Sequence, residues 1–156
     1  MSYITPFNAK VALTYDDITL APSYSEVESR QKINLETQLT TNYKLMVPLI
    51  ASPMDTVCEF DMALTMLHLG GVGIIHRFMS IENQSLMVAD ISNIVNKKGF
   101  TGIYNTGLHD VWNTTIPIAA AVGANGDYLE RAQELTKAGA NVILIDVALS
   151  LIHISE

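Results

Sequence analysis

The stretch VPLIASPMDTVCEFDMALTMLHLGGVGIIHR, residues 47–77, decides the fold. Its apolar runs at residues 47–51 and 72–77 are typical of buried parallel strands. Between the two runs, apolar residues recur at helical spacing: Phe60, Ala63, Leu64 and Leu67. The pair Gly70-Gly71 ends the predicted helix, because glycine accepts the left-handed conformation of a helix C-terminus. The order strand, helix, strand predicts a βαβ unit, whose ligands bind at the carboxyl ends of the strands.

Polar side chains follow both predicted strands and are the first candidate site residues. Ser52, Met54, Asp55 and Thr56 follow the first strand, and His76 ends the second. Each has a purely structural alternative. Ser52 and Thr56 can cap the following helix, and Asp55 can stabilise its first turn. Met54 can fill the core, and His76 can be a hydrogen-bonded buried histidine.

The composition favours one ordinary domain and excludes several classes of function. Of 156 residues, 49% are hydrophobic, and the formal net charge is −7. No run of lysine or arginine is present, so we expect neither nucleic acid nor an anionic membrane as a partner. No apolar stretch reaches the roughly 18 residues of a membrane span. One cysteine, Cys58, and an N-terminus unlike a secretory signal favour a cytoplasmic protein.

The residues before the βαβ unit, 1–46, are predicted to form an N-terminal arm with capping strands. Residues 13–22 alternate and then reach a proline, which favours a short strand or an extended arm. Residues 33–39 alternate as well and predict an edge or capping strand. Residues 40–43 form a predicted turn.

After the βαβ unit, Ser80 is the predicted N-cap of another amphipathic helix. Its apolar stripe is Met87, Ile91, Ile94 and Val95. The connection over residues 96–115 has little periodicity, and its role stays open between a functional excursion, a remnant of an inserted module and a flap.

The remaining residues predict a third strand, a third helix and a fourth strand. The strands are the apolar runs 116–123 and 141–146, and both are expected to be buried. Asn125 and Asp127 are candidate caps of the helix between them, and Gly139 ends it. The apolar side of this helix is predicted to be Leu129, Ala132, Leu135 and Ala138. Asp146 ends the fourth strand, where a carboxylate is costly unless it is paired or solvated.

Four blocks of sequence together resemble the inosine-5′-monophosphate dehydrogenase family, whose sister enzyme is GMP reductase. The blocks are LTYDDITLAPSYSEV (13–27), VPLIASPMDTV (47–57), GGVGIIHRFMSIENQ (70–84) and AAAVGANGDYLERAQELTKAGANVILIDVA (119–148). The resemblance implies the N-terminal half of a (β/α)8 TIM barrel over residues 47–148, with four parallel strands. It implies oxidation of IMP to XMP with NAD as cofactor and a homo-oligomeric assembly. Residues 149–156 depart from the family pattern and are treated as an atypical tail.

The same resemblance implies roles for single residues. Ser52 and Met54 match positions that line the nucleotide pocket. Asp146 matches the acid that meets the NAD ribose, while Asn125 and His76 match positions near the dinucleotide.

The departures from the family pattern are informative. The two-repeat nucleotide-sensing module is replaced by about 20 residues, so we expect no regulation through it. The nucleophilic cysteine loop and the potassium site of the family belong to a later part of the barrel. Cys58 does not match the nucleophile, so we assign no catalytic residue and expect the chain to be inactive alone. No residues stand at metal-ligand spacing, and no G-x-G-x-x-G fingerprint follows a strand.

Two alternatives to the dehydrogenase remain. One is a GMP reductase, which converts GMP to IMP with NADPH. The wording of ASPMDTV and GGVGIIHR resembles the dehydrogenase more closely, because the reductase usually carries asparagine before the methionine, where this chain has Pro53. The other is a non-catalytic half-barrel that associates with itself or docks a partner through its open strand edges.

Overall fold

The computed structural model describes residues 13–97 and 116–147. Most of the 96–115 connection and the tail after residue 148 therefore lie outside the described residues. The chain divides into two compact units, residues 1–34 and 35–156. The predicted domain boundaries at residues 46 and 148 stay predictions.

The elements follow one another in a simple order. They are η1 (Tyr15–Asp17), η2 (Arg30–Lys32), β1 (Thr37–Gln38), β2 (Lys44–Leu45), β3 (Ile50–Ala51), α1 (Phe60–His68), β4 (Val72–Ile75), α2 (Ile81–Val95), β5 (Ala119–Val122), α3 (Tyr128–Ala138) and β6 (Val142–Ile145).

The first unit contains two 3-10 turns and, over residues 13–34, no strand. Of the two alternatives predicted for residues 13–22, a short strand or an extended arm, the strand is therefore wrong. Asp17 Oδ2 accepts hydrogen bonds from the backbone N (2.8 Å) and the Oγ1 (3.0 Å) of Thr14. This capping box closes the turn η1, and the chain is extended again at Ile18. Local side-chain bonding has replaced the strand that the alternation suggested.

The second unit begins with a short β-hairpin, which is the predicted β arm. Strands β1 and β2 pair antiparallel, and the turn predicted at residues 40–43 joins them. The predicted strand over 33–39 is shortened to Thr37–Gln38. The backbone N–H groups of Met46 and Val47 both donate to the Gly70 carbonyl, at 2.9 and 3.0 Å. Gly70 has φ +84°, and a Cβ there would lie 2.8 Å from Met46 Cβ, so only glycine fits this attachment.

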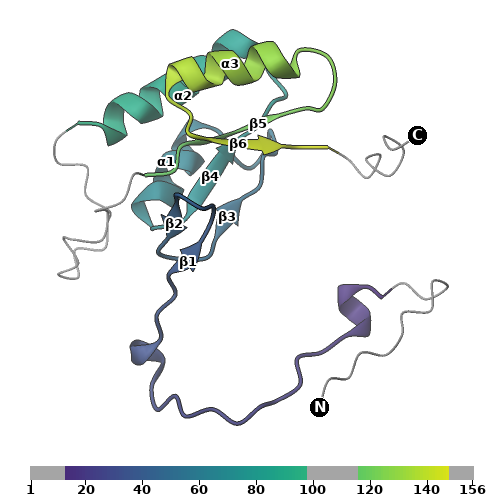
Figure 1. Ribbon diagram of the computed structural model, residues 1–156, viewed down its shortest axis with the longest axis vertical. Coiled ribbons are helices and arrows are strands. Elements are labelled where there is room, and N and C mark those ends of the chain that lie inside the picture. The colour runs from purple at the N-terminus through teal and green to yellow at the C-terminus, as the bar shows by residue number, and fades with distance from the viewer. Residues whose placement is uncertain (1–12, 98–115, 148–156) are drawn as a thin grey trace. The chain divides into compact units, whose positions relative to one another are not determined.

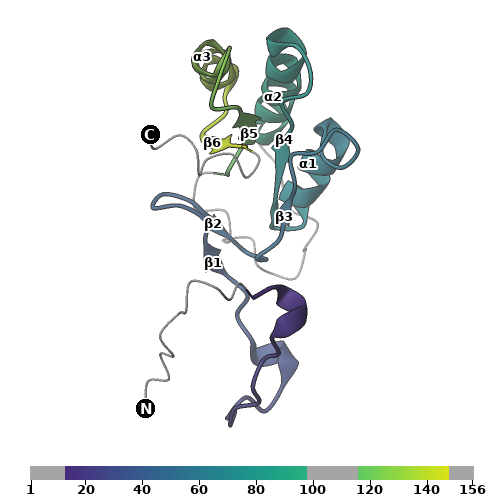
Figure 2. The same ribbon diagram turned by 90° about the vertical axis from the view of Figure 1, so that its right-hand side faces the viewer.

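The main body is a four-stranded parallel sheet with the order β3-β4-β5-β6. Neighbouring strands in the sheet are also consecutive in the chain, and a helix joins each pair (Figure 1). Helices α1, α2 and α3 lie along one face of the sheet (Figure 2). This arrangement is the one predicted for part of a (β/α)8 barrel, in which every helix packs on the outside.

The core lies between the sheet and the helices. Strands β4 and β5 are buried throughout, and Leu67, Ile91 and Leu135 are the central residues that α1, α2 and α3 contribute. The predicted ends of the helices are confirmed at two places. Ser80 Oγ accepts from Asn83 N at 3.2 Å, and Gly139 has φ +111° at the end of α3.

Three predictions about burial are wrong. Strand β3 is shorter than predicted, and its Ile50 is 50% exposed. Strand β6 alternates between partly buried and exposed positions, and Ile145 is 64% exposed. Both are the outer strands of the described sheet, so each has a neighbour on one side only. On α3, Leu129 is 60% exposed and Arg131 takes a buried position instead.

Candidate functional site

The residues that follow the four parallel strands stand at one edge of the sheet. Ser52 follows β3, His76 and Arg77 follow β4, the turn 123–127 follows β5, and Asp146 follows β6. Because the strands are parallel and neighbouring, their carboxyl ends meet along the same edge. The candidate site is this edge.

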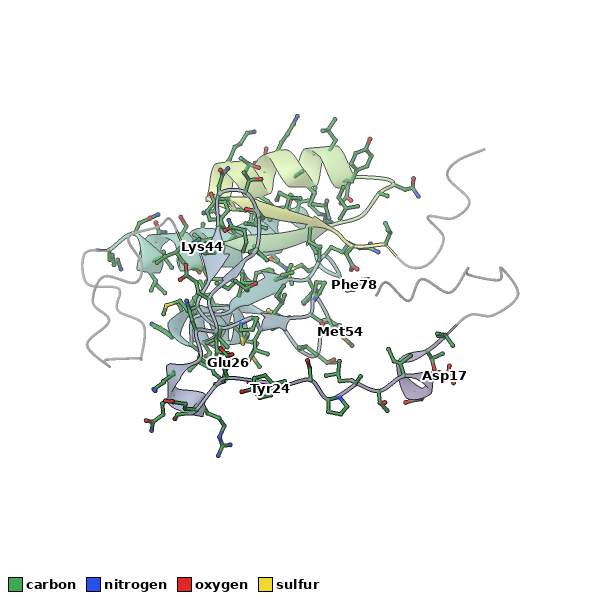
Figure 3. The ribbon with its side chains drawn as sticks, turned by 60° about the horizontal axis from the view of Figure 1, so that its bottom comes forward. Asp17, Tyr24, Glu26, Lys44, Met54 and Phe78 are labelled. Atoms are coloured by element: carbon green, nitrogen blue, oxygen red, sulfur yellow. The ribbon has the colours of Figure 1, made fainter. Side chains whose placement is uncertain are left out.

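Ser52 and Met54 lie in the turn between β3 and α1, and both are exposed. The Ser52 carbonyl accepts from Met54 N at 2.8 Å, and the Met54 carbonyl accepts from Val57 N and Cys58 N, each at 2.9 Å. The Met54 side chain (Figure 3) is 51% exposed and is therefore not core filler. Its turn is fixed by the backbone hydrogen bonds. Both side chains are available to a ligand.

Cys58 closes the same turn but faces inward. It is fully buried, and burial raises the pKa of its thiol to about 11, while a hydrogen bond with the Ile74 backbone works in the opposite direction. A thiol with this pKa stays protonated at neutral pH, and the thiolate is the nucleophilic form. Cys58 is thus unsuited to nucleophilic catalysis, in agreement with its mismatch to the family's catalytic cysteine.

His76 is 2% exposed and uses both ring nitrogens within the chain. Its Nδ1 accepts from Phe78 N at 3.1 Å, and its Nε2 lies 3.1 Å from Glu59 Oε1. Because a backbone N–H only donates, Nδ1 carries no proton, so Nε2–H donates to the carboxylate. The hydrogen bonds fit the structural alternative, and a contact between His76 and a cofactor stays a prediction.

Arg77 and Asp146 are brought together across the end of β5. Arg77 Nε lies 3.8 Å from Asp146 Oδ2, and both side chains are about one-third exposed. The Arg77 guanidinium also stands over the exposed Phe78 ring, 4.9 Å from its centroid. The sequence singled out Asp146 but not Arg77, although Arg77 follows directly after the predicted site residue His76.

The turn after β5 carries Asn125 and Asp127. Asn125 is exposed. Asp127 occupies the N-cap position of α3, but its side chain does not cap the helix. Its Oδ2 instead accepts from Nε and Nη2 of Arg131, at 3.1 and 2.6 Å. The hydrogen bond with Arg131 is the main cause of the lowered pKa of Asp127. Burial opposes this shift, and the charges of Arg131 and Arg77 lower the pKa further.

A buried polar network beneath the edge was missed by the sequence interpretation. Gln84 is fully buried and donates from Nε2 to the carbonyls of Ile75 (3.3 Å) and Ala121 (2.9 Å), at the ends of β4 and β5. Arg131 Nη1 donates to Gln84 Oε1 at 2.8 Å and to the Met79 carbonyl at 3.0 Å. The sequence did carry a signal for this burial. Gln84 lies one helical turn before Val88, so both residues are on the same face of α2.

The network joins both neighbouring strand ends to α2 and α3. It therefore fixes the positions of the turns that carry Arg77 and Asn125.

Over residues 13–97 and 116–147, no group of three His, Cys, Asp or Glu side chains is arranged to hold a metal ion. None of the helices in those ranges combines the length and apolar character that a membrane span requires.

Comparison with known proteins assigns the family. The sequence pattern described as "IMP dehydrogenase / GMP reductase domain" matches residues 12–153. The inosine-5'-monophosphate dehydrogenase of Cryptosporidium parvum is 37% identical over an alignment that covers 90% of this chain and 40% of that protein. The enzyme of the same name from Borreliella burgdorferi is 34% identical, over 89% of this chain and 42% of its own length.

A protein of the other name is also similar. The GMP reductase of Leishmania donovani is 52% identical over 79 residues, which are 51% of this chain and 16% of that protein. The chain thus spans less than half the length of each of these relatives. The family match over most of the chain, with the parallel βα order and the strand-end residues, confirms the predicted partial TIM barrel. The chain belongs to the IMP dehydrogenase / GMP reductase family of oxidoreductases.

Proposed function

We propose that this chain forms part of an IMP dehydrogenase, which converts IMP, NAD and water to XMP and NADH. The observation that carries the proposal is the row of ligand-accessible polar residues at the carboxyl edge of the sheet, from Ser52 to Asp146. The two relatives that match about nine-tenths of this chain are both named as the dehydrogenase, which supports this choice.

The turn after β3 would contact the purine mononucleotide. Ser52 supplies a hydroxyl, which both donates and accepts hydrogen bonds. Met54 supplies a polarisable apolar surface suited to a flat base. Both are exposed in a turn held by backbone hydrogen bonds, so binding would require little rearrangement.

The ends of β5 and β6 would contact the cofactor. Asp146 is one-third exposed and an acceptor, so its carboxylate suits the hydroxyls of a ribose. Asn125 lies in the turn after the neighbouring strand β5, where it is exposed and offers a side-chain amide. His76, held by Glu59 and Phe78, would shape the floor between the two ligands. The residues present thus fit NAD, which when bound would supply the hydride acceptor.

The chemical step itself needs a nucleophile that these 156 residues do not supply. Their single cysteine, Cys58, is buried and protonated at neutral pH. The role of this chain would accordingly be to bind and orient the two ligands. Potassium, expected for the family, is assigned no ligand here.

A GMP reductase activity is the second candidate, favoured by the high identity to the Leishmania relative over half of the chain. The two activities differ in ligand pairs: IMP with NAD, or GMP with NADPH. Calorimetric titration of the chain with each of the four nucleotides separates them. We expect binding of IMP and NAD, weakened by Asp146→Asn for NAD only. Preferential binding of GMP and NADPH would favour the reductase, and binding of none would contradict both.

Self-association of the half-barrel is the third candidate, and exposed apolar side chains on the outer strands favour it. Ile50 on β3 and Ile143 and Ile145 on β6 are all at least one-third exposed. Outer strands also present unpaired backbone groups to a neighbour. Light scattering during size-exclusion chromatography at several concentrations tests this, and we expect a homo-oligomer. A monomer at every concentration would contradict it.

A further inference from the structure

The hydrogen-bonding capacity of Arg77 is largely unused. A guanidinium carries five N–H donors. The Nε atom of Arg77 is buried from solvent and has no hydrogen-bond partner among the residues that the structure describes. The carboxylate of Asp146 is 3.8 Å away, which is beyond a hydrogen bond, although it is close enough for attraction between the charges. A buried donor without a partner is costly, so this arrangement calls for an acceptor.

Three neighbours fix the direction of the guanidinium. The Phe78 ring supports one face of it at 4.9 Å, as in a cation–π contact. Asp146 attracts it towards the end of β6. Gly123 has no side chain and so leaves room for the guanidinium above β5. A Cβ added at Gly123 would lie 3.6 Å from Arg77 Nη1. The guanidinium therefore lies above the end of β5, between the turns after β4 and β6.

The neighbouring groups suggest the ligand. A guanidinium pairs best with phosphate or carboxylate oxygens through two parallel hydrogen bonds. Asp146, directly beside it, is an acceptor for hydroxyl groups. Asp146 and the guanidinium of Arg77 together are therefore complementary to a ribose with an attached phosphate, which is the part that all nucleotides share.

We propose that Arg77 binds a phosphate group of a nucleotide at the carboxyl edge of the sheet, next to the ribose held by Asp146. The inference rests on the proposed function and adds to it a phosphate contact in a chain of net charge −7. The phosphate could belong to a dinucleotide or to a purine mononucleotide, and the test separates these sources.

The test uses the full chain and the variants Arg77→Met, Arg77→Lys and Lys137→Met. Lys137 is an exposed lysine paired with Glu134 on α3, so its variant removes one positive charge away from the edge. Affinities are measured for NAD, nicotinamide riboside, IMP and inosine, so that each phosphorylated ligand has a counterpart without phosphate. Circular dichroism checks that every variant is folded.

We expect Arg77→Met to weaken one phosphorylated ligand by about tenfold or more, the typical effect of losing a charged hydrogen bond. The counterpart without phosphate should keep its affinity. The affinity of Arg77→Lys should lie between those of the wild type and Arg77→Met, because lysine keeps the charge but cannot form two parallel hydrogen bonds. Lys137→Met should be neutral. Equal losses for the phosphorylated and the phosphate-free ligand, or no loss, would overturn the inference.

A direct readout separates failure of this inference from failure of the proposed function. The Nε–H resonance of Arg77 is assigned from the Arg77→Lys spectrum and followed during titration with inorganic pyrophosphate. We expect a saturable shift. If neither NAD nor IMP binds but the resonance shifts with pyrophosphate and with another nucleotide such as GMP, the proposed function fails and the phosphate contact stands. If NAD and IMP bind and the resonance is unmoved by pyrophosphate and by both nucleotides, the phosphate contact fails alone.

Discussion

The contact between α1 and β4 and the contact between α2 and α3 hold the same edge of the sheet by opposite means. At the first, backbones approach so closely that a Cβ on Gly73 would lie 2.5 Å from Ala63 Cα and 2.8 Å from Cys58 Sγ. At the second, a buried glutamine and arginine fill the space with hydrogen bonds. The first contact depends on shape alone, and the second depends on matching donors with acceptors.

The difference bears on how each strand end is positioned. Close packing against α1 prevents β4 from shifting, but it does not fix the position of the turn that follows β4. The network instead reaches the carbonyls of Ile75 and Ala121, so it sets the separation of β4 and β5 where they end. Replacing one residue in each contact should therefore have distinct consequences.

The largest loss of stability is expected from Gln84→Leu. It removes two donors to strand carbonyls and an acceptor of Arg131, all buried, at about 1–3 kcal/mol for each unsatisfied group. We expect the free energy of unfolding in urea to fall by about 3 kcal/mol in total. The control is Gln133→Leu, the same change at an exposed position of α3. Similar values for the two variants would show that the network contributes nothing particular.

Gly73→Ala should cost somewhat less, about 2 kcal/mol, because the added methyl overlaps the α1 backbone and forces a local shift. Gly123→Ala is the matched control, since its methyl would meet its nearest neighbours at 3.6 Å, an ordinary contact. Thermal or urea unfolding of both variants measures the difference. A Gly73 variant as stable as the Gly123 variant would refute close packing as the principle of the first contact.

The start of α2 should matter less than either contact. Ser80→Ala removes the hydroxyl that accepts from Asn83 N, and we expect a loss of about 1 kcal/mol. Ser80→Gly should cost only a few tenths, because glycine is itself a tolerated N-cap. If alanine and glycine behave alike in urea unfolding, the cap does not stabilise α2.

The last effect concerns Cys58, and it is absent at neutral pH and visible only in alkali. Its pKa is raised by burial from 9.0 to about 11, so the unfolded chain releases this proton at lower pH than the folded chain. The contribution of the protonated Cys58 thiol to the free energy of unfolding is complete below about pH 9. It is lost as the pH rises towards 11. The stability difference between wild type and Cys58→Ala should therefore shrink between pH 8 and pH 10.5. A constant difference would mean that the thiol is not desolvated.

The sequence predicted the features that depend on local chemistry. Strand ends are marked by the change from apolar to polar residues, as at Ile75 and His76, and helix ends by Ser80 and Gly139. The alternation of four strands with three helices then leaves few arrangements other than a parallel sheet. The turn at Met54 and the edge position of Asp146 followed from the same reasoning.

What the sequence did not predict depends on contacts between distant residues. Arg131 is charged and was not expected inside, but its donors meet acceptors on Met79, Gln84 and Asp127, which makes its burial tolerable. Leu129 was expected inside and is exposed, since α3 turns that face outward. The ion pair of Arg77 with Asp146 joins positions 69 residues apart, and no local pattern indicates it.

The shared acceptor at Gly70 has a consequence for dynamics. The amide protons of Met46 and Val47 are both held by this single carbonyl, just beyond the last turn of α1. When that turn frays, both amide protons lose their acceptor at once. The two amides should therefore exchange with deuterated solvent at one common rate. The hairpin and the helix would then open as a single cooperative unit, although they are separated by β3 in the chain.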